Sequence, residues 1–246
     1  MGLNNRTAII TGAAGGIGLA IARRLLRDGT NVVLADLDEQ GLAAASDELG
    51  KEADQKRILT SRCDVSVEAN VIATVDTAMQ HFGRVDIIVN NAGLMVFKPL
   101  EQQTAEDWSR ILSVDLVGAF YFIKQAFLRM HGGGAIVNIA SVHAIETEPM
   151  VASYAAAKAA LLSLTRSAAL EGKPKNIRVN AIVPGAIDTP MLWDNPNVKA
   201  GIEVIDKRDV GTPADVADVV SFLVSDDSRF IQGASLLVDG GRLARL

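Results

Sequence analysis

The chain has 246 residues, enough for one large α/β domain with a substantial hydrophobic core. Its net charge of −5 and the absence of a basic run argue against nucleic acid or acidic membranes as main partners. Cys63 is the only cysteine, which excludes an intrachain disulfide and agrees with a cytoplasmic location. No apolar run approaches the length of a membrane span, so we expect no membrane partner.

Short β-branched runs alternate with longer amphipathic stretches along the whole chain. The expected strands are 7–10, 31–35, 56–62, 86–90, 134–139, 178–183 and 235–238. The expected helices are 17–28, 39–52, 67–82, 105–130, 153–172 and 213–225. Several strands are apolar on both sides, as in Ala8-Ile9-Ile10. This alternation predicts an α/β fold with a parallel sheet that is covered on both faces.

No internal repeat or linker interrupts the pattern, so residues 1–246 form one predicted domain. The exception to its regularity is the segment 188–211, which contains Pro190 and Pro196. It follows the end of a strand, where α/β proteins place their ligand loops. We therefore expect this segment to be the substrate loop.

A glycine-rich segment, Thr11 to Gly18, follows the first strand and opens the first helix. Glycines at Gly12, Gly16 and Gly18 let the chain turn sharply and let backbone amides approach a pyrophosphate. The helix N-terminus then stabilises that anion. A tight strand–helix connection without a ligand is the alternative, but the strand before and the helix after favour dinucleotide binding.

Asp36 ends the second strand, 18 residues beyond Gly18. A carboxylate there can accept hydrogen bonds from both hydroxyls of the adenine ribose and repels the 2′-phosphate of NADP. Positions 15 and 37, where a lysine or arginine could pair with such a phosphate, are Gly15 and Leu37 in this chain. The charge pattern therefore predicts NAD rather than NADP, although Asp36 could also serve only as a turn residue.

Small and polar residues also follow the third and fourth strands. Asp64-Val65 ends one, and Asn90-Asn91-Ala92-Gly93 ends the other. Both lie at carboxyl ends of strands, where a doubly wound sheet binds its ligand. Turn chemistry alone accounts for such residues too, but successive polar strand ends suit a cofactor that lies along that edge.

Tyr154 and Lys158 are four residues apart and so share one face of a helix. Ser141, thirteen residues before the tyrosine, follows a buried strand. A phenol, whose pKa is about 10, carries protons usefully only if this pKa is drawn toward the working pH. A neighbouring ammonium lowers it by favouring the phenolate, and a nearby hydroxyl can hold a substrate oxygen.

These motifs occur in order with Pro184-Gly185, Thr189 and a final Val238-Asp239-Gly240-Gly241. Over essentially its whole length the chain resembles the short-chain dehydrogenase/reductase family. The resemblance implies a Rossmann-like, doubly wound, seven-stranded parallel sheet with helices on both faces. It also implies a homotetramer and NAD(P)-dependent oxidation of an alcohol or reduction of a carbonyl.

The resemblance implies a role for each matching residue. Tyr154 would be the general acid/base, and Lys158 would hold the nicotinamide ribose hydroxyls and lower the phenol pKa. Ser141 would hydrogen-bond the substrate oxygen. The implied cofactor-binding residues are Gly12, Gly15, Gly16, Ile17, Gly18, Asp36, Leu37, Asp64, Val65, Asn91, Ala92, Gly93, Tyr154, Lys158, Pro184, Gly185, Ile187 and Thr189.

One position departs from the family pattern. The family has a catalytic asparagine where this chain reads Val114-Asp115-Leu116. An ionised Asp115 can accept hydrogen bonds from water but cannot donate them. It would also raise the pKa of Lys158 and oppose a nearby phenolate. We hypothesise that Asp115 is a fourth catalytic residue that supports the proton relay with a shifted pH optimum, the alternative being a silent substitution.

The substrate is less well defined by the sequence. His143 and Trp193, with Ser141 and Tyr154, are the expected substrate contacts. We also expect the carboxylates Glu146 and Glu148 near the pocket. Two carboxylates, an imidazole and an indole suit a polyhydroxylated compound, and Ser141-Val142-His143 faintly resembles sugar dehydrogenases. The chain has three histidines and no Cys/His cluster, so a catalytic metal is not expected.

The leading interpretation is an NAD-dependent dehydrogenase that acts on a secondary alcohol, sugar, polyol or other small hydroxy compound. One alternative is a 3-oxoacyl-thioester reductase acting on acyl carrier protein or coenzyme A thioesters, against which Asp36 argues because such reductases usually prefer NADPH. A second alternative is a non-catalytic dinucleotide-binding protein, against which the intact Ser141, Tyr154 and Lys158 argue. The two long helices 105–130 and 153–172 could pair with a symmetry mate.

Overall fold

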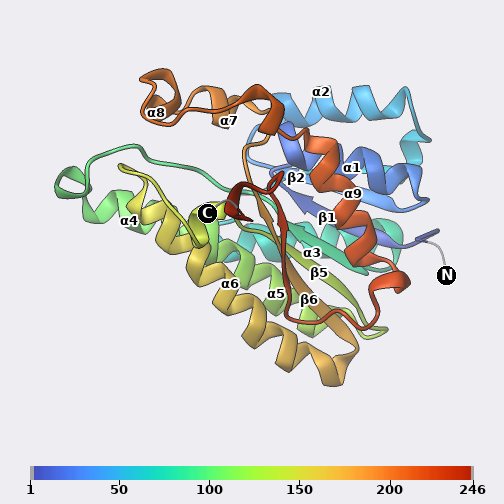
Figure 1. The fold of residues 1–246 in the computed structure, drawn as a ribbon. Helices are drawn as coiled ribbons and strands as arrows, with labels where there is room; N and C mark the ends of the chain where they lie inside the picture. The colour runs from blue at the N-terminus through green and yellow to red at the C-terminus, as the bar shows by residue number, and fades with distance from the viewer. Residues whose placement is uncertain (1–2, 245–246) are drawn as a thin grey trace.

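The computed structural model of the protein describes residues 3–244. A seven-stranded parallel sheet forms its centre, in the order β3-β2-β1-β4-β5-β6-β7 (Figure 1). The predicted Rossmann-like doubly wound sheet is therefore confirmed, with its reversal of strand order between β1 and β4. Its strands are β1 (Thr7–Thr11), β2 (Asn31–Asp36), β3 (Ile58–Arg62), β4 (Ile87–Asn90), β5 (Gly134–Ile139), β6 (Ile177–Pro184) and β7 (Ser235–Val238).

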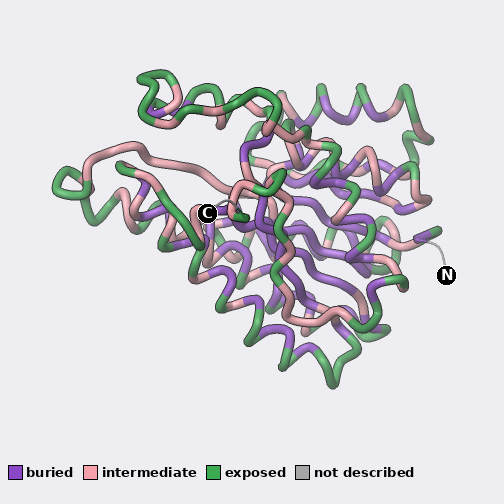
Figure 2. Tube along the Cα trace, in the orientation of Figure 1, coloured by how far each residue is buried: buried purple, intermediate pink, exposed green. Residues whose placement is uncertain are grey.

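Helices cover both faces of this sheet because its central strands are apolar on both sides. In β1, Ile10 packs into the core shared with α1 and α9, whereas Ile9 packs into the core shared with α3 and α5. Buried residues accordingly follow the strands and the inner sides of the helices (Figure 2). The longer helices are α1 (Gly16–Arg27), α2 (Glu39–Gly50), α3 (Glu68–Phe82), α4 (Ala105–Leu112), α5 (Gly118–Arg129), α6 (Ala152–Gly172) and α9 (Pro213–Val224).

Most expected helices and strands agree with the structure to within two residues, and two of the differences have a clear structural reason. The strand expected from residue 56 begins at Ile58, because Gln55–Arg57 forms a 3-10 turn whose Lys56 amide donates to the Asp54 carboxylate at 3.0 Å. The single helix expected over 105–130 is broken into α4 and α5 by a π turn at Ser113–Val117. That turn contains Asp115, and π turns inside helices are frequent at functional sites.

The helical segment 105–129 is long and apolar enough to cross a membrane, which the sequence analysis did not anticipate. Its apolar side chains have another explanation in the fold. Phe122, Ile123 and Ala126 are buried in the core between α5 and the sheet. A core helix of a globular protein passes the same test of length and composition.

A buried chain of hydrogen bonds fixes α6 to the centre of the sheet. The Asn90 side-chain amide of β4 donates to Asn138 of β5 at 2.8 Å, and Asn138 donates to the Thr165 hydroxyl of α6 at 2.8 Å. All three side chains are buried. Because buried polar groups are costly when unpaired, this chain sets one position of α6 relative to β4 and β5.

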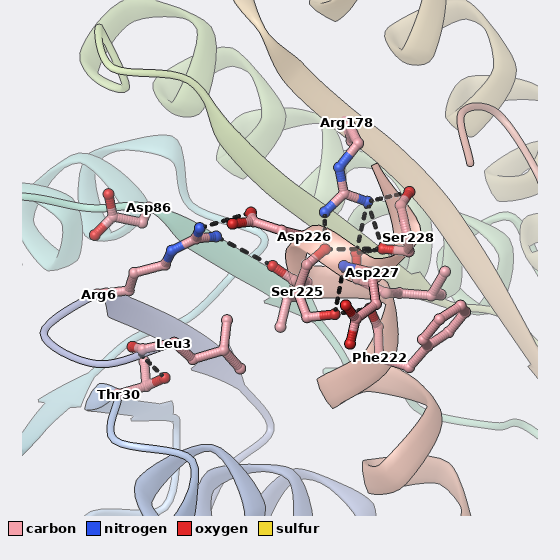
Figure 3. A network of polar contacts seen from close by, with 12 residues as sticks. Leu3, Arg6, Thr30, Asp86, Arg178, Phe222, Ser225, Asp226, Asp227 and Ser228 are labelled. Atoms are coloured by element: carbon pink, nitrogen blue, oxygen red, sulfur yellow. Dashed lines mark hydrogen bonds and ion pairs between the residues drawn. The ribbon is translucent and has the colours of Figure 1, made fainter. Parts of the chain in front are cut away.

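Two arginines join separate elements at the edge of the sheet where its strands begin (Figure 3). Arg178 of β6 donates to the Leu223 and Ser225 carbonyls at 2.7 and 2.9 Å, where α9 ends. Arg6 pairs with Asp226 at 2.8 Å. Burial and the nearby Arg6 lower the pKa of Arg178. This network fastens the end of α9 to β6 and to the segment before β1.

The segment 188–211 contains two short helices, α7 (Pro190–Trp193) and α8 (Pro196–Lys199). It stands apart from the sheet beyond the end of β6 (Figure 1). Ile187 and Gly211 form an isolated parallel bridge at its base. The two ends of the segment are thus held together at the carboxyl edge of the sheet, where a ligand loop is expected.

Candidate active site

One cavity of about 490 Å³ follows the carboxyl edge of the sheet. Residues that come after β1 to β6 line it, together with the start of α6 and the 188–211 segment. Of the predicted site residues, those in its lining are Gly12, Gly15, Gly16, Ile17, Asp36, Leu37, Asp64, Val65, Asn91, Ala92, Gly93, Ser141, His143, Tyr154, Lys158, Pro184, Gly185, Ile187 and Thr189. Gly18, Asp115 and Trp193 lie outside this lining.

The glycine loop between β1 and α1 has the geometry that its sequence predicts. Gly12 and Gly16 have φ angles of 64° and 53°, a conformation that side chains disfavour. Gly18, which we expected to bind the cofactor, does not line the cavity. It is buried in α1, and a Cβ there would overlap the Gly12 carbonyl oxygen. Gly18 therefore lets the loop fold back on the helix rather than facing the cavity.

The Asn90–Gly93 turn supports this loop. Asn91 Nδ2 donates to the Thr11 and Gly12 carbonyl oxygens at 2.9 and 3.2 Å. The Thr11 hydroxyl accepts the backbone N–H groups of Asn91 and Ala92, both at 2.9 Å. The Asn91 side chain is thus engaged with protein, and Thr11 is a supporting residue that the sequence analysis did not single out.

Asp36 lies at the end of β2 where the cavity meets the glycine loop. Its carboxylate accepts the Ala14 N–H at 3.0 Å and the Asp38 N–H at 3.1 Å. Leu37 beside it is exposed and also lines the cavity. Asp64, one strand further along, accepts the Ser66 N–H and hydroxyl at 3.0 and 2.6 Å. Asp36 thus holds its own turn and the glycine loop, Asp64 holds its own turn, and both residues line the cavity.

Ser141, Tyr154 and Lys158 come together at the other end of the cavity. Lys158 Nζ donates to the Ile139 carbonyl at 3.1 Å and lies 5.4 Å from the centre of the Tyr154 ring. Ser141 caps the short turn after β5, its hydroxyl accepting the His143 N–H at 3.2 Å. Tyr154 and Lys158 are buried. A hydroxyl, a phenol and an ammonium thus share one desolvated corner.

The pKa of Tyr154 differs from the sequence prediction. Burial raises it, Lys158 lowers it by less, and Asp115 raises it again, so the net shift is upward. The expected pull of the ammonium is present, but removal of the phenol from water outweighs it. Burial lowers the pKa of Lys158, but Asp115 and Tyr154 raise it by more. The ammonium form of Lys158 is therefore favoured next to the phenol.

Asp115 lies behind Lys158, in the π turn, and not at the cavity itself. Its Oδ2 is 3.3 Å from Lys158 Nζ, and its Oδ1 accepts the Leu94 N–H at 3.0 Å. Burial raises the pKa of the Asp115 carboxyl, while Lys158 and the Leu94 amide lower it by less. A Cβ at Gly93 would lie 2.8 Å from Oδ2, so the carboxylate is closely enclosed.

The substrate end of the cavity contains the predicted His143, two polar residues of the predicted substrate loop, and Arg242, which the sequence analysis did not expect there. His143 lines it, with its ring edge-to-face against Tyr154 at 5.9 Å between centroids. Burial lowers the pKa of His143 and so favours the neutral imidazole. The additional polar lining residues are Asn195, Glu203 and Arg242. Only the tertiary fold brings these three to His143, because they come from the 188–211 segment and the chain after β7.

Trp193 does not line the cavity, contrary to the sequence analysis. Its indole Nε1 donates to Asp188 Oδ1 at 2.7 Å across the start of α7, and its ring is partly exposed. Met191 and Leu192 of the same short helix line the cavity instead.

The shape and chemistry of the cavity fit a nicotinamide dinucleotide. It is continuous from a carboxylate at Asp36, past the glycine loop, to the Tyr154 corner. A Cβ at Gly15 would meet nothing within 4 Å, so the loop leaves open space where a pyrophosphate would approach the start of α1. Among the described residues, no group of three or more His, Cys, Asp or Glu could hold a metal ion.

A doubly wound sheet with one long cavity at its carboxyl edge defines a nucleotide-binding α/β protein. A family model described as enoyl-(acyl carrier protein) reductase matches residues 12–242. The 3beta-hydroxysteroid dehydrogenase 1 of Eggerthella lenta is 40% identical over 250 residues, 97% of this chain and 94% of that protein. The cis-4-hydroxycyclohexanecarboxylate dehydrogenase of Sinomonas cyclohexanicum is 40% identical over 248 residues, 97% of each chain.

The crystal structure of levodione reductase matches with a TM-score of 0.90 at 35% identity and covers 99% of this chain and 100% of that one. The chain belongs to the short-chain dehydrogenase/reductase family. It is an oxidoreductase that transfers a hydride between a nicotinamide dinucleotide and a secondary alcohol or carbonyl. The alternative of a non-catalytic dinucleotide-binding protein does not agree with this membership.

Proposed function

We propose that the protein is an NAD-dependent dehydrogenase of a small hydroxy compound such as a polyol, sugar or diol, with Tyr154 as the general acid/base. The observation that supports this most is the single cavity that joins Asp36 and the glycine loop to Ser141, Tyr154 and Lys158. Hydride transfer needs a cofactor face, a proton carrier and a donor to the substrate oxygen within one desolvated site.

The proposed residue roles follow from their positions. In oxidation, the Tyr154 phenolate accepts the proton of the substrate hydroxyl, and the Ser141 hydroxyl holds the substrate oxygen. Lys158 favours the phenolate by its charge and would hold the nicotinamide ribose. Asp115 keeps Lys158 protonated and fixes its position through the 3.3 Å ion pair. The cofactor, when bound, supplies the hydride acceptor.

The proposed preference for NAD depends on Asp36. Its carboxylate faces the cavity beside the glycine loop, where it would accept hydrogen bonds from ribose hydroxyls and repel a 2′-phosphate. Of the described residues, Arg62 is at the adjoining end of β3, but it pairs with Glu39 at 3.2 Å and is not in the cavity lining.

We also propose that the chain acts as one domain in a cytoplasmic homotetramer. Large apolar side chains are exposed on α5 and α6, where Phe120, Leu128 and Leu170 are 43%, 54% and 75% exposed. Exposed large apolar side chains on these two helices favour a contact with another copy. The single cysteine, Cys63, is buried and free, in keeping with a reducing compartment.

The direct test is reduction of NAD⁺ or NADP⁺, followed by absorbance, against sugars, polyols, secondary alcohols and 3-hydroxyacyl thioesters. We expect NAD-dependent oxidation of a neutral hydroxy compound. The thioesters are included because the matching family model is described as enoyl-(acyl carrier protein) reductase, an enzyme whose substrate is an acyl thioester. Oxidation confined to thioesters with NADP⁺ would replace the proposed function with that of a 3-oxoacyl-thioester reductase.

A further inference from the structure

A polar cluster forms the wall of the cavity at its substrate end. It consists of Glu148, Asn195, Glu203 and Arg242, which come from three separate parts of the chain. Asn195, Glu203 and Arg242 line the cavity, and Glu148 supports them from outside its lining. None of the four has a part in the proton transfer proposed for Tyr154.

The cluster is ordered by its own contacts. Arg242 Nη2 is 2.7 Å from Glu203 Oε1. Asn195 Nδ2 donates to Glu148 Oε1 at 2.9 Å and to Glu203 Oε2 at 3.2 Å. The Glu203 side chain is 11% exposed, so its carboxyl group is largely removed from water. The guanidinium and the carboxyl group are therefore held in place before any substrate binds.

The Val238–Gly241 motif places Arg242 over the cavity. Asp239 accepts the Gly241 N–H and the Leu243 N–H, both at 2.9 Å, and so folds the chain into a short turn around Arg242. Gly185 allows this turn to lie against the end of β6, because a Cβ there would be 2.8 Å from the Asp239 Cα. The motif thus has a structural purpose that its sequence did not reveal.

The charges in the cluster decide what it can bind. One guanidinium pairs with the Glu203 carboxyl group, Glu148 lies next to that carboxyl group through Asn195, and burial together with Glu148 raises the pKa of Glu203. A substrate carboxylate would be a third acid beside one cation, which is unfavourable in a desolvated wall. A hydroxyl or carbonyl oxygen has no such conflict. The guanidinium can donate to it, and the carboxyl oxygens can accept from a hydroxyl.

The cluster also lies within reach of the proposed reaction centre. His143 packs against Tyr154 at 5.9 Å between ring centroids, and its pKa responds to Glu203 and Arg242. Met95 and Leu192 provide apolar lining for the same cavity. A small carbon skeleton can thus contact Ser141 and Tyr154 with one oxygen and the cluster with another.

We propose that Arg242 and Glu203 recognise a second, uncharged oxygen of the substrate, a hydroxyl or a carbonyl, and reject a carboxylate at that place. The substrate class is then a diol or a hydroxyketone. The inference depends on the proposed function, because it names the substrate class of the same cavity. It makes Arg242 and Glu203 specificity-determining residues with no part in the proton transfer.

Three alcohols on one ring test this inference: cyclohexanol, cyclohexane-1,4-diol and 4-hydroxycyclohexanecarboxylate. With saturating NAD⁺, we expect kcat/KM for the diol to exceed that for cyclohexanol by about tenfold or more, since a site built to bind a hydroxyl discriminates against its absence. We expect the carboxylate to be the poorest of the three. A carboxylate that equals or exceeds the diol would overturn the inference.

The variant Glu203→Gln keeps the shape of the side chain, removes its charge and frees Arg242. We expect the variant to gain about tenfold in kcat/KM for the carboxylate, mainly through KM, and to change little on cyclohexanol. Glu101→Gln is the matched control, an exposed carboxylate outside the cavity. Equal losses on all three alcohols, with a lower unfolding temperature, would show a merely structural role and refute the inference.

A binding readout separates this inference from the proposed function. The unfolding temperature is measured with NADH plus each alcohol, which cannot react with the reduced cofactor. We expect the diol to raise it more than cyclohexanol does, and this ranking is obtained even if no alcohol is oxidised. Absence of turnover with this ranking intact would contradict only the proposed function. A diol that adds no stabilisation would contradict the inference.

Discussion

At the scale of single residues, we assign the proposed proton transfer to the corner around Lys158. Asp115 stands where the family pattern has an asparagine, and the sequence analysis already expected it to act on Lys158. The structure gives the contact between the two, a buried ion pair at 3.3 Å. Breaking such a pair leaves a buried charge uncompensated, so the substitution has a defined electrostatic consequence.

Replacement of Asp115 by asparagine is predicted to move the pH–rate profile of oxidation to lower pH. Asp115 raises the pKa of both Tyr154 and Lys158, so both values fall when its charge is removed. Tyr154 must be a phenolate to accept a proton, so kcat for oxidation rises as the pH passes the pKa of Tyr154. In the variant this rise would occur at lower pH. The measurement is kcat against pH, with Asp47→Asn on an exposed position of α2 as the control. An unchanged profile would contradict the role assigned to Asp115.

Replacement of Asp36 by asparagine is predicted to weaken the preference for NAD⁺ over NADP⁺ by about 10- to 100-fold in kcat/KM, because it removes a like charge beside the 2′-phosphate. An asparagine oxygen can still accept the Ala14 N–H, so the glycine loop keeps its hydrogen bond. The ratio of kcat/KM for the two cofactors is the readout. If the ratio stays the same, Asp36 is only a turn residue.

At the scale of elements, most strands and helices were predictable because their apolar patterns match burial on both sides of the sheet. The π turn between α4 and α5 could not be predicted. It holds Asp115 against Lys158 and the Leu94 amide, and these contacts join residues that are far apart in the sequence. The position of Trp193 could not be predicted either. Its indole suits a pocket, but it donates a hydrogen bond to Asp188 and lies outside the cavity lining.

The β1–α1 turn gives a stability prediction with an internal control. Gly18→Ala forces a Cβ against the Gly12 carbonyl oxygen, so we expect a loss of about 1–3 kcal/mol in the free energy of unfolding, as for other overpacked sites. Gly15→Ala introduces the same atom where nothing lies within 4 Å and the backbone is extended, with φ at −172°. Urea unfolding compares the two. Equal stability would show that the loop does not depend on the close approach at Gly18.

At the scale of the whole molecule, the cofactor end of the cavity could be predicted and the substrate end could not. Motifs such as Thr11–Gly18 directly follow their strands, so the sheet topology alone brings them to one edge. Glu203 and Arg242 meet only because the 188–211 segment and the chain after β7 return over that edge. No local pattern in the sequence encodes that meeting.

The proposed homotetramer, which the family resemblance implies, is supported by the exposed apolar side chains of α5 and α6. Sedimentation velocity of the native protein is expected to give a tetramer, and the double variant Leu128→Asp/Leu170→Asp a smaller species with an unchanged far-UV spectrum. Both side chains are more than half exposed, so their replacement leaves the core intact. A native monomer at working concentration would refute the prediction.

The central claim, that Tyr154 is the proton carrier of an NAD-dependent dehydrogenase, is tested most directly by Tyr154→Phe. The change removes only the hydroxyl oxygen from a buried ring, so the fold and the affinity for NADH should be retained. We predict that kcat for the best alcohol falls by about 10²- to 10⁴-fold, the usual contribution of a positioned acid or base. A variant that binds NADH normally and still turns over at the native rate would contradict the account.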